Sequence, residues 1–151
     1  MRLAEIMSTP VYTIERNLDL ESARELMRVH RVRHLVVVEA QTPVGILSDH
    51  EMGGALDRFE PAVGTAADRM IRRPVTATPQ TTVREAANML RGHRIGALPI
   101  VENGKLCGIV TVTDLLDLLG RGAVAPSPGK RRVTLSKRRP ALGARLRAGE
   151  V

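Results

Sequence analysis

Apolar residues in the first half of the chain follow two spacings: short continuous runs, and recurrence every three to four positions. The run Leu35–Val38 is typical of a strand that is buried on both faces. The recurrent spacing predicts a helix with one apolar face. In order, the pattern predicts a strand at Val11–Ile14, a helix face of Leu20, Ala23, Leu26 and Met27, strands at Leu35–Val38 and Val44–Leu47, and a second helix face of Met52, Ala55, Leu56 and Phe59.

The second half of the chain predicts the same order of elements. They are a strand at Val75–Thr78, a helix face of Val83, Ala86, Met89 and Leu90, strands at Leu98–Val101 and Leu106–Val110, and a final helix at Leu115–Leu119. Thr82 and Glu85 have the spacing of a capping box at the start of the longer helix. Asn103-Gly104 predicts a tight hairpin turn between the last two strands. Each half is therefore predicted to be strand, helix, strand, strand, helix.

The two halves are also related residue by residue, at an offset of 63 positions. Residues 67–119 align with residues 4–56, so that His93-Arg94 matches His30-Arg31 and Gly108-Ile109 matches Gly45-Ile46. Two similar units usually pack on each other and form related clefts, and two copies favour a symmetric pair over an open array. We expect an α/β (α+β) fold of two tandem βαββα repeats, at residues 3–59 and 65–120, with a linker at 60–64.

The net positive charge is concentrated at the C-terminal end. Of 23 basic and 16 acidic residues, residues 121–151 hold nine basic and one acidic, which leaves 14 basic and 15 acidic for the other 120 residues. A polar, basic segment bounded by Pro and Gly buries little apolar surface. We expect residues 121–151 to be a basic, mostly flexible tail, in which a short helix at Leu142–Arg147 is only weakly indicated.

Composition narrows the class of protein further. A hydrophobic content of 43% can form a core, which must be aliphatic because Tyr12 and Phe59 are the only aromatic residues. No stretch approaches the roughly 20 apolar residues that span a bilayer, and the N-terminus has no apolar run of the signal-peptide type. The single cysteine, Cys107, excludes an internal disulfide and suits a reducing compartment. We therefore expect a cytoplasmic protein with no membrane partner.

The repeated motifs resemble a known family. Both halves carry a Met shortly before Pro-Val, then His-Arg, then Val-Glu after a buried strand, then Gly-Ile with Ser or Thr and an acidic residue following. This pattern is similar to the cystathionine beta-synthase (CBS) domain, and two in tandem resemble a CBS pair, or Bateman module, over about residues 3–119. The resemblance implies a regulatory module with a pseudo-twofold axis, clefts that bind AMP, ADP, ATP or S-adenosylmethionine, and association into a homodimer.

Thr111 and Asp114 form the strongest chemical motif, because they stand where a strand enters a helix. A helix N-terminus suits phosphate, the Thr hydroxyl can donate to phosphate, and the Asp carboxylate can accept from both ribose hydroxyls. The pair matches the ribose-phosphate motif of the family it resembles. The alternative is plain helix capping, which favours the same residue types. Arg72 and Arg73 are candidate phosphate partners, or merely solvated arginines.

An adenine base would need an apolar slot with backbone partners. In the second repeat the candidates are Val75, Thr76, Ala77, Ile95, Gly96, Ala97 and Pro99, among which Gly96 and Ala97 are small enough to leave room. The equivalents in the first repeat are Tyr12, Thr13, Val32, Arg33 and His34, with Ser48 and Glu51 at the motif positions. Glu51 departs from the pattern and Asp49 would repel phosphate, so we expect this first site to be weaker or empty. The alternative is that these residues are only sheet edges and core.

Other candidate chemistry is sparse. His30 and His34 are four positions apart, but a helix end and a strand start separate them, and we expect no metal site. Cys107 is expected to be a small buried apolar residue. No arrangement of residues indicates catalysis, so the leading hypothesis is a non-enzymatic sensor of an adenine-containing ligand that signals to a protein partner. The alternatives are a protein that associates with nucleic acid through its basic tail, and a structural dimer with degenerate sites.

Overall fold

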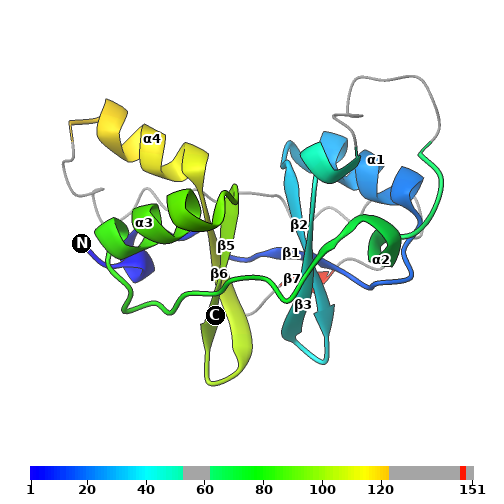
Figure 1. The fold of residues 1–151 in the computed structure, drawn as a ribbon, viewed down its shortest axis with the longest axis horizontal. Coiled ribbons are helices and arrows are strands. Elements are labelled where there is room, and N and C mark those ends of the chain that lie inside the picture. The colour runs from blue at the N-terminus through cyan, green and yellow to red at the C-terminus, as the bar shows by residue number, and fades with distance from the viewer. Residues whose placement is uncertain (53–61, 123–146, 149–151) are drawn as a thin grey trace.

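The computed structural model describes residues 1–52, 62–122 and 147–148, and within them two similar units lie side by side (Figure 1). The first unit is a five-stranded sheet in the order β4-β3-β2-β1-β7. Its strands are β1 (Tyr12–Ile14), β2 (His34–Glu39), β3 (Thr42–Ser48), β4 (Ile71–Arg72) and β7 (Arg147–Ala148). Strand β1 is parallel to β2, whereas the other neighbours are antiparallel. The helices α1 (Leu20–His30) and α2 (Ala66–Arg69) lie beside this sheet in Figure 1.

The second unit repeats this plan with less regular strand pairing. Strands β5 (Ala97–Glu102) and β6 (Lys105–Thr111) form an antiparallel hairpin, and α3 (Val83–His93) and α4 (Val112–Gly120) lie beside it (Figure 1). Two isolated bridges extend the hairpin: Ala77 pairs in parallel with Ile100, and Ser8 pairs antiparallel with Ile109. The offset of 63 maps these bridges onto the β1–β2 and β3–β4 pairings. The predicted pair of βαββα repeats is confirmed by this shared plan.

Local sequence signals account for the helix ends. The α3 capping box forms as predicted, with the Thr82 amide donating to the Glu85 carboxylate at 2.7 Å. Asp19 caps α1 in the equivalent position by accepting from the Ser22 amide at 2.8 Å. Both helices end at an arginine in the left-handed region, Arg31 and Arg94, each with φ of 53°. Matching caps therefore set matching helix lengths in the two repeats.

Each unit is completed by a segment from the other repeat. We call residues 1–9 the first arm and residues 64–72 the second arm. In the first arm, the Leu3 amide donates to the Thr81 carbonyl at 2.8 Å, beside the second unit. In the second arm, the Ala66 amide donates to the Leu18 carbonyl at 2.8 Å, beside the first unit. The two arms cross reciprocally, so the N-terminus lies beside α3 and α2 lies beside α1 (Figure 1).

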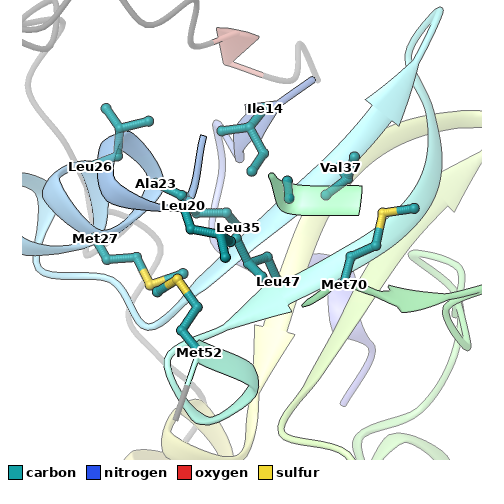
Figure 2. Packing of buried hydrophobic residues seen from close by; sticks show 11 residues of the cluster. Ile14, Leu20, Ala23, Leu26, Met27, Leu35, Val37, Leu47, Met52 and Met70 are labelled. Atoms are coloured by element: carbon teal, nitrogen blue, oxygen red, sulfur yellow. The ribbon is translucent and has the colours of Figure 1, made fainter. Parts of the chain in front are cut away.

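The hydrophobic cores show the same crossing. The first core holds Ala66 and Met70 of the second arm among the residues of the first repeat (Figure 2). Its buried members are Ile14, Leu20, Ala23, Leu26, Met27, Leu35, Val37, Leu47, Met52, Ala66 and Met70. The second core holds the fully buried Leu3 of the first arm with Ala77, Ala86, Leu90, Leu98, Ile100, Cys107 and Val110. A third cluster of Val11, Val36, Val38 and Leu106 joins the two sheets.

Several predicted elements need correction or lie outside the described part. The strand predicted at Val75–Thr78 is wrong beyond the single Ala77 bridge. Pro74 has no amide to donate, and the Thr78 amide donates to the Thr81 hydroxyl at 3.0 Å in a turn. Among the described residues, the other predicted strands and helix faces are confirmed to within a few residues, and the Asn103-Gly104 turn has the expected positive φ values of 52° and 76°.

The second helix of the first repeat was predicted through Ala55, Leu56 and Phe59, which lie outside the described residues, as does part of the 60–64 linker. Met52, the first residue of that predicted face, ends a short 3₁₀ helix (His50–Met52) and is buried. Most of the basic tail is also outside the described residues. Its residues Arg147–Ala148 form β7, which departs from the expectation of a flexible tail and of a helix ending at Arg147.

Candidate functional site

A cavity of about 340 Å³ lies between the two repeats. The first repeat contributes the start of β2 and the turn that follows β3, and the second repeat contributes the end of the second arm and the approach to β5. The lining residues are Arg33, His34, Ile46, Ser48, Asp49, His50, Glu51, Ile71, Arg73, Pro74, Val75, Arg94, Ile95, Gly96 and Ala97. A cleft of this volume with an apolar base and a few polar groups is typical of a small-molecule site.

The cavity combines residues that the sequence analysis assigned to two separate sites. From the main predicted slot it contains Arg73, Val75, Ile95, Gly96 and Ala97. From the weaker predicted site it contains Arg33, His34, Ser48 and Glu51. The crossed arms explain the mixture, because β4 of the second arm pairs with β3 and brings Arg73–Val75 beside the first repeat. Sequence spacing could not reveal this grouping, since it depends on which unit each arm joins.

The remaining predicted residues lie outside this cavity. Thr76 is exposed, whereas Ala77 and Pro99 are joined by a backbone hydrogen bond of 3.0 Å from the Ala77 amide to the Pro99 carbonyl. Arg72 lies in β4 opposite Gly45. Tyr12 stacks on His30, Thr13 is buried in β1, and Val32 packs against the first core. Thr111 and Asp114 are at the junction of β6 and α4.

Thr111 and Asp114 are engaged with each other. The Thr111 amide donates to the Asp114 carboxylate at 2.8 Å, and the Asp114 amide donates to the Thr111 hydroxyl at 3.2 Å. This reciprocal capping box is the alternative that the sequence left open beside ribose-phosphate binding. The two roles are compatible, because a cap uses only part of the hydrogen-bonding capacity of the carboxylate.

Ser48 and Glu51 occupy the equivalent corner and face the cavity. The Glu51 amide donates to the Ser48 hydroxyl at 3.2 Å, which repeats half of the capping box. Within the described part of the chain, the Glu51 carboxylate makes no return hydrogen bond. This carboxylate is therefore a candidate acceptor for a bound molecule, and the expectation that Glu51 weakens the first site stays a prediction.

The cavity carries charges of both signs. Asp49, expected to repel phosphate, lies 3.4 Å from an Arg33 guanidinium nitrogen, which carries the opposite charge. Arg73 and Arg94 also line the cavity, and neither forms an ion pair with any residue that the structure describes. Two unpaired guanidinium groups at one cleft favour an anionic ligand, because guanidinium binds phosphate and carboxylate through paired donors.

His34 sits where the two repeats meet. A Cβ placed on Gly96 would lie only 2.8 Å from the His34 Nε2 atom, so the space beside Gly96 is filled by this imidazole. Burial lowers the pKa of His34, and the carboxylates of Asp114 and Asp49 oppose that shift. The imidazole is therefore neutral at pH 7. The room that Gly96 was expected to leave beside the strand is occupied by His34.

His30 and Cys107 are buried outside the cavity. His30 stacks on Tyr12 with ring centroids 4.3 Å apart, and its Nε2 atom has no hydrogen-bond partner among the described residues. Burial lowers the pKa of His30 and raises the pKa of the Cys107 thiol. The prediction that Cys107 is a small buried residue is confirmed, with Sγ donating to the Ile100 carbonyl at 3.4 Å.

The described ranges 1–52, 62–122 and 147–148 contain no group of three His, Cys, Asp or Glu side chains placed to hold a metal ion. These ranges also contain no helix with the length and apolar character needed to cross a membrane. The basic clusters Lys130–Arg132 and Lys137–Arg139 lie outside these ranges, so binding of nucleic acid through the tail stays a prediction.

Comparison with known proteins places both repeats in one family. The model of the CBS domain matches residues 3–56 and 65–121. The inosine-5'-monophosphate dehydrogenase of Thermoplasma acidophilum is 31% identical over 112 residues, which are 74% of this chain and 22% of that enzyme. The CBS domain-containing protein YhcV of Bacillus subtilis is 29% identical over 112 residues, which are 74% of this chain and 80% of that protein. The chain therefore spans about a fifth of the dehydrogenase but most of YhcV.

The solved structures include a similar pair of domains with bound ligands. The CBS domain pair of protein MJ0100, in complex with 5'-methylthioadenosine and S-adenosyl-L-methionine, superposes with a TM-score of 0.72 at 26% sequence identity. The superposition covers 81% of this chain and 98% of that chain.

Proposed function

This chain belongs to the CBS domain family, as a tandem pair, and from that premise we propose that it is a non-enzymatic regulatory module for an adenine nucleotide or adenosyl ligand. The observation that carries the proposal is the cavity between the repeats, which gathers apolar, hydroxyl, carboxylate and guanidinium groups in one place. A pair of domains related by a pseudo-twofold axis is suited to coupling ligand binding to a change in how its units meet.

The lining residues divide by chemistry into three groups. Val75, Ile95 and Ala97 offer an apolar surface for a flat base. The Ser48 hydroxyl and the Glu51 carboxylate offer a donor and an acceptor for a ribose. Arg73 and Arg94 offer donors to a phosphate, with Arg33 held near Asp49. By the offset of 63 positions, Thr111 and Asp114 would take the ribose role in a second cleft, in which Tyr12 and Val32 would correspond to Val75 and Ile95.

The relatives support this choice of ligand without identifying it. The CBS pair of protein MJ0100 holds two adenosyl compounds and shares 26% of its residues with this chain. The dehydrogenase relative is matched over only 22% of its length, so its activity is not transferred to this chain. We propose that the signal passes to a separate protein partner.

We also propose that the module acts as a homodimer. Along α4 the side chains of Val112, Leu116 and Leu119 are 40%, 60% and 68% exposed. Their spacing of four and three positions places them on one face of the helix. An exposed apolar stripe of this kind favours association between copies.

Calorimetric titration of ligand-free protein with AMP, ADP, ATP and S-adenosylmethionine tests the proposal. We expect saturable binding of at least one of these compounds, with weaker binding by Glu51→Ala. The matched control is Glu25→Ala on the outer part of α1, which should bind as the unmodified protein does. If the folded protein gives no binding with all four compounds at millimolar concentration, the structural-dimer alternative is favoured instead.

A further inference from the structure

The outer edge of β1 differs from the equivalent edge of the second repeat. In the first repeat, Thr13 is only 3% exposed. In the second repeat, Thr76 is the equivalent of Thr13 and is exposed. The two equivalent threonines therefore have opposite environments, whereas the residues that follow them, Ile14 and Ala77, are buried in both repeats.

The covering segment is β7 in the basic tail. Arg147 pairs with Thr13, and Ala148 pairs with Tyr12, in an antiparallel register. The backbone amides and carbonyls along a strand edge must find hydrogen-bond partners. Strand β7 supplies these partners to β1, which would otherwise be the unpaired edge strand of the sheet β4-β3-β2-β1.

The sequence of each edge supports the difference. Proline blocks strand pairing, and natural proteins use it to protect exposed edges. The second repeat has Pro74 and Pro79 around its edge segment, whereas the equivalent positions of the first repeat are Val11 and Arg16. The edge segment of the second repeat therefore has a proline on both sides, whereas that of the first repeat has Pro10 on its N-terminal side and no proline at Arg16 on its C-terminal side.

We propose that the outer edge of β1 is a strand-docking site, and that its occupant is the C-terminal segment of the same chain molecule. The kind of partner that this edge fits is an extended peptide in antiparallel register, and the chain provides one itself. This inference goes beyond the proposed ligand binding and does not depend on it.

The length of the connecting segment supports docking within one molecule. Gly122 and Arg147 are the described residues on either side of it. About 25 peptide units at roughly 3.3–3.6 Å each reach about 80–90 Å, several times the radius of gyration of about 14 Å expected for a unit of this size. A tether of this kind keeps the local concentration of the segment near the millimolar range, which exceeds ordinary protein concentrations.

Hydrogen–deuterium exchange of the full chain and of a chain that ends at residue 146 tests the docking. We expect the amides of Tyr12–Ile14 to exchange at least about tenfold faster after the truncation, while those of β5 are unchanged. Replacing both Arg147 and Ala148 with proline should have the same effect, whereas Arg147→Ala, which keeps the backbone amide, should not. Equal exchange in the full and truncated chains would overturn the proposal.

A cross-link distinguishes docking within one molecule from docking between two. Opposing residues of an antiparallel pair have Cβ atoms about 4.5–5.5 Å apart, close to disulfide geometry. In a Cys107→Ala background, Thr13→Cys combined with Arg147→Cys should oxidise to a cross-linked single chain at low concentration. A product made of two chains would show that the occupant comes from a second copy, and no cross-link in the folded protein would contradict the pairing itself.

Discussion

The side chain of Met7 lies directly over Gly108, where an added Cβ would be 2.5 Å from its sulfur and 3.0 Å from its Cγ. Met70 covers Gly45 with the same two distances, 63 positions away in each case. The methionine of each arm therefore packs against a glycine in the β-hairpin of the other repeat.

Gly108→Ala should therefore lower the free energy of unfolding by about 1–3 kcal/mol, because Met7 and its arm must move to admit the methyl group. Urea denaturation measures the change. The control is Gly92→Ala on α3, where nothing lies within 4 Å of the added Cβ. That change should raise stability by about 0.5–1 kcal/mol, since alanine is the better helix former. A loss as large as that of Gly108→Ala would refute the argument.

Arg73→Ala should weaken binding of AMP by about 1.5–3 kcal/mol, the usual value for a hydrogen bond to a charged group. Its neighbour Arg72 is similarly exposed but does not line the cavity, so Arg72→Ala is a matched control. Calorimetry with AMP and with 5'-methylthioadenosine, which has no phosphate, separates the roles. Equal losses for both ligands would place Arg73 away from the phosphate.

Gly96→Ala should reduce binding in the cavity, because its methyl group must displace the His34 imidazole, whose Nε2 atom is 2.8 Å from the Cβ position. The double variant with His34→Ala should recover stability relative to Gly96→Ala alone, since the obstructing ring is gone. Thermal denaturation of both variants and of His34→Ala completes the cycle. Additive effects of the two substitutions would contradict a direct contact.

The free energy of unfolding should fall as the pH is lowered from about 7 to 5, because histidine side chains take up protons in this range. Burial lowers the pKa of both His30 and His34, so the unfolded chain binds more protons once the pH falls below the ordinary value near 6.5. The loss begins there and continues until the pH reaches the lowered pKa values of the folded state. The midpoint of urea denaturation across this range measures it.

His30→Leu should flatten this dependence, because it removes one of the two buried imidazoles. The equivalent residue of the second repeat, His93, is exposed, and His93→Leu is the matched control. The carboxylates of Asp19, Glu21, Asp68 and Glu85 also have lowered pKa values, but their contribution is lost only at more acidic pH. An unchanged slope in His30→Leu would assign the effect to another group.

Leu116→Glu with Leu119→Glu on α4 should shift the protein from dimer to monomer, because charges on the apolar stripe oppose its burial. Sedimentation equilibrium measures the association state. Val29→Glu on α1, where the side chain is 49% exposed, is the control and should leave association unchanged. A dimer of unaltered stability in the double variant would place the interface elsewhere.

The offset of 63 positions predicted much of this structure, because equivalent residues meet equivalent environments. This offset relates the helix caps at Asp19 and Thr82, and it also relates the glycines that the methionines contact, Gly45 and Gly108. The crossing of the arms could not be predicted in this way. Residues 1–9 and 64–72 carry similar signals, and their spacing is the same whichever unit they complete.

The candidate site was predictable in its residue types but not in its grouping. Val75, Ile95 and Gly96 were assigned to a slot with Thr111, whereas the cavity joins them to Ser48 and Glu51. Two local details were also hidden. The side chain that fills the space beside Gly96 comes from residue 34, and the strand-accepting edge of β1 is recognisable only once β7 is paired to it.

The crossed arms have a consequence for the folding of either half alone. A single repeat carries an arm with no core to enter, and a core that lacks its arm. Two copies of one repeat could form both missing contacts by exchanging their arms, which is domain swapping. The whole chain is then equivalent to such a swapped dimer made continuous by its linker, and its two units should melt in one cooperative transition.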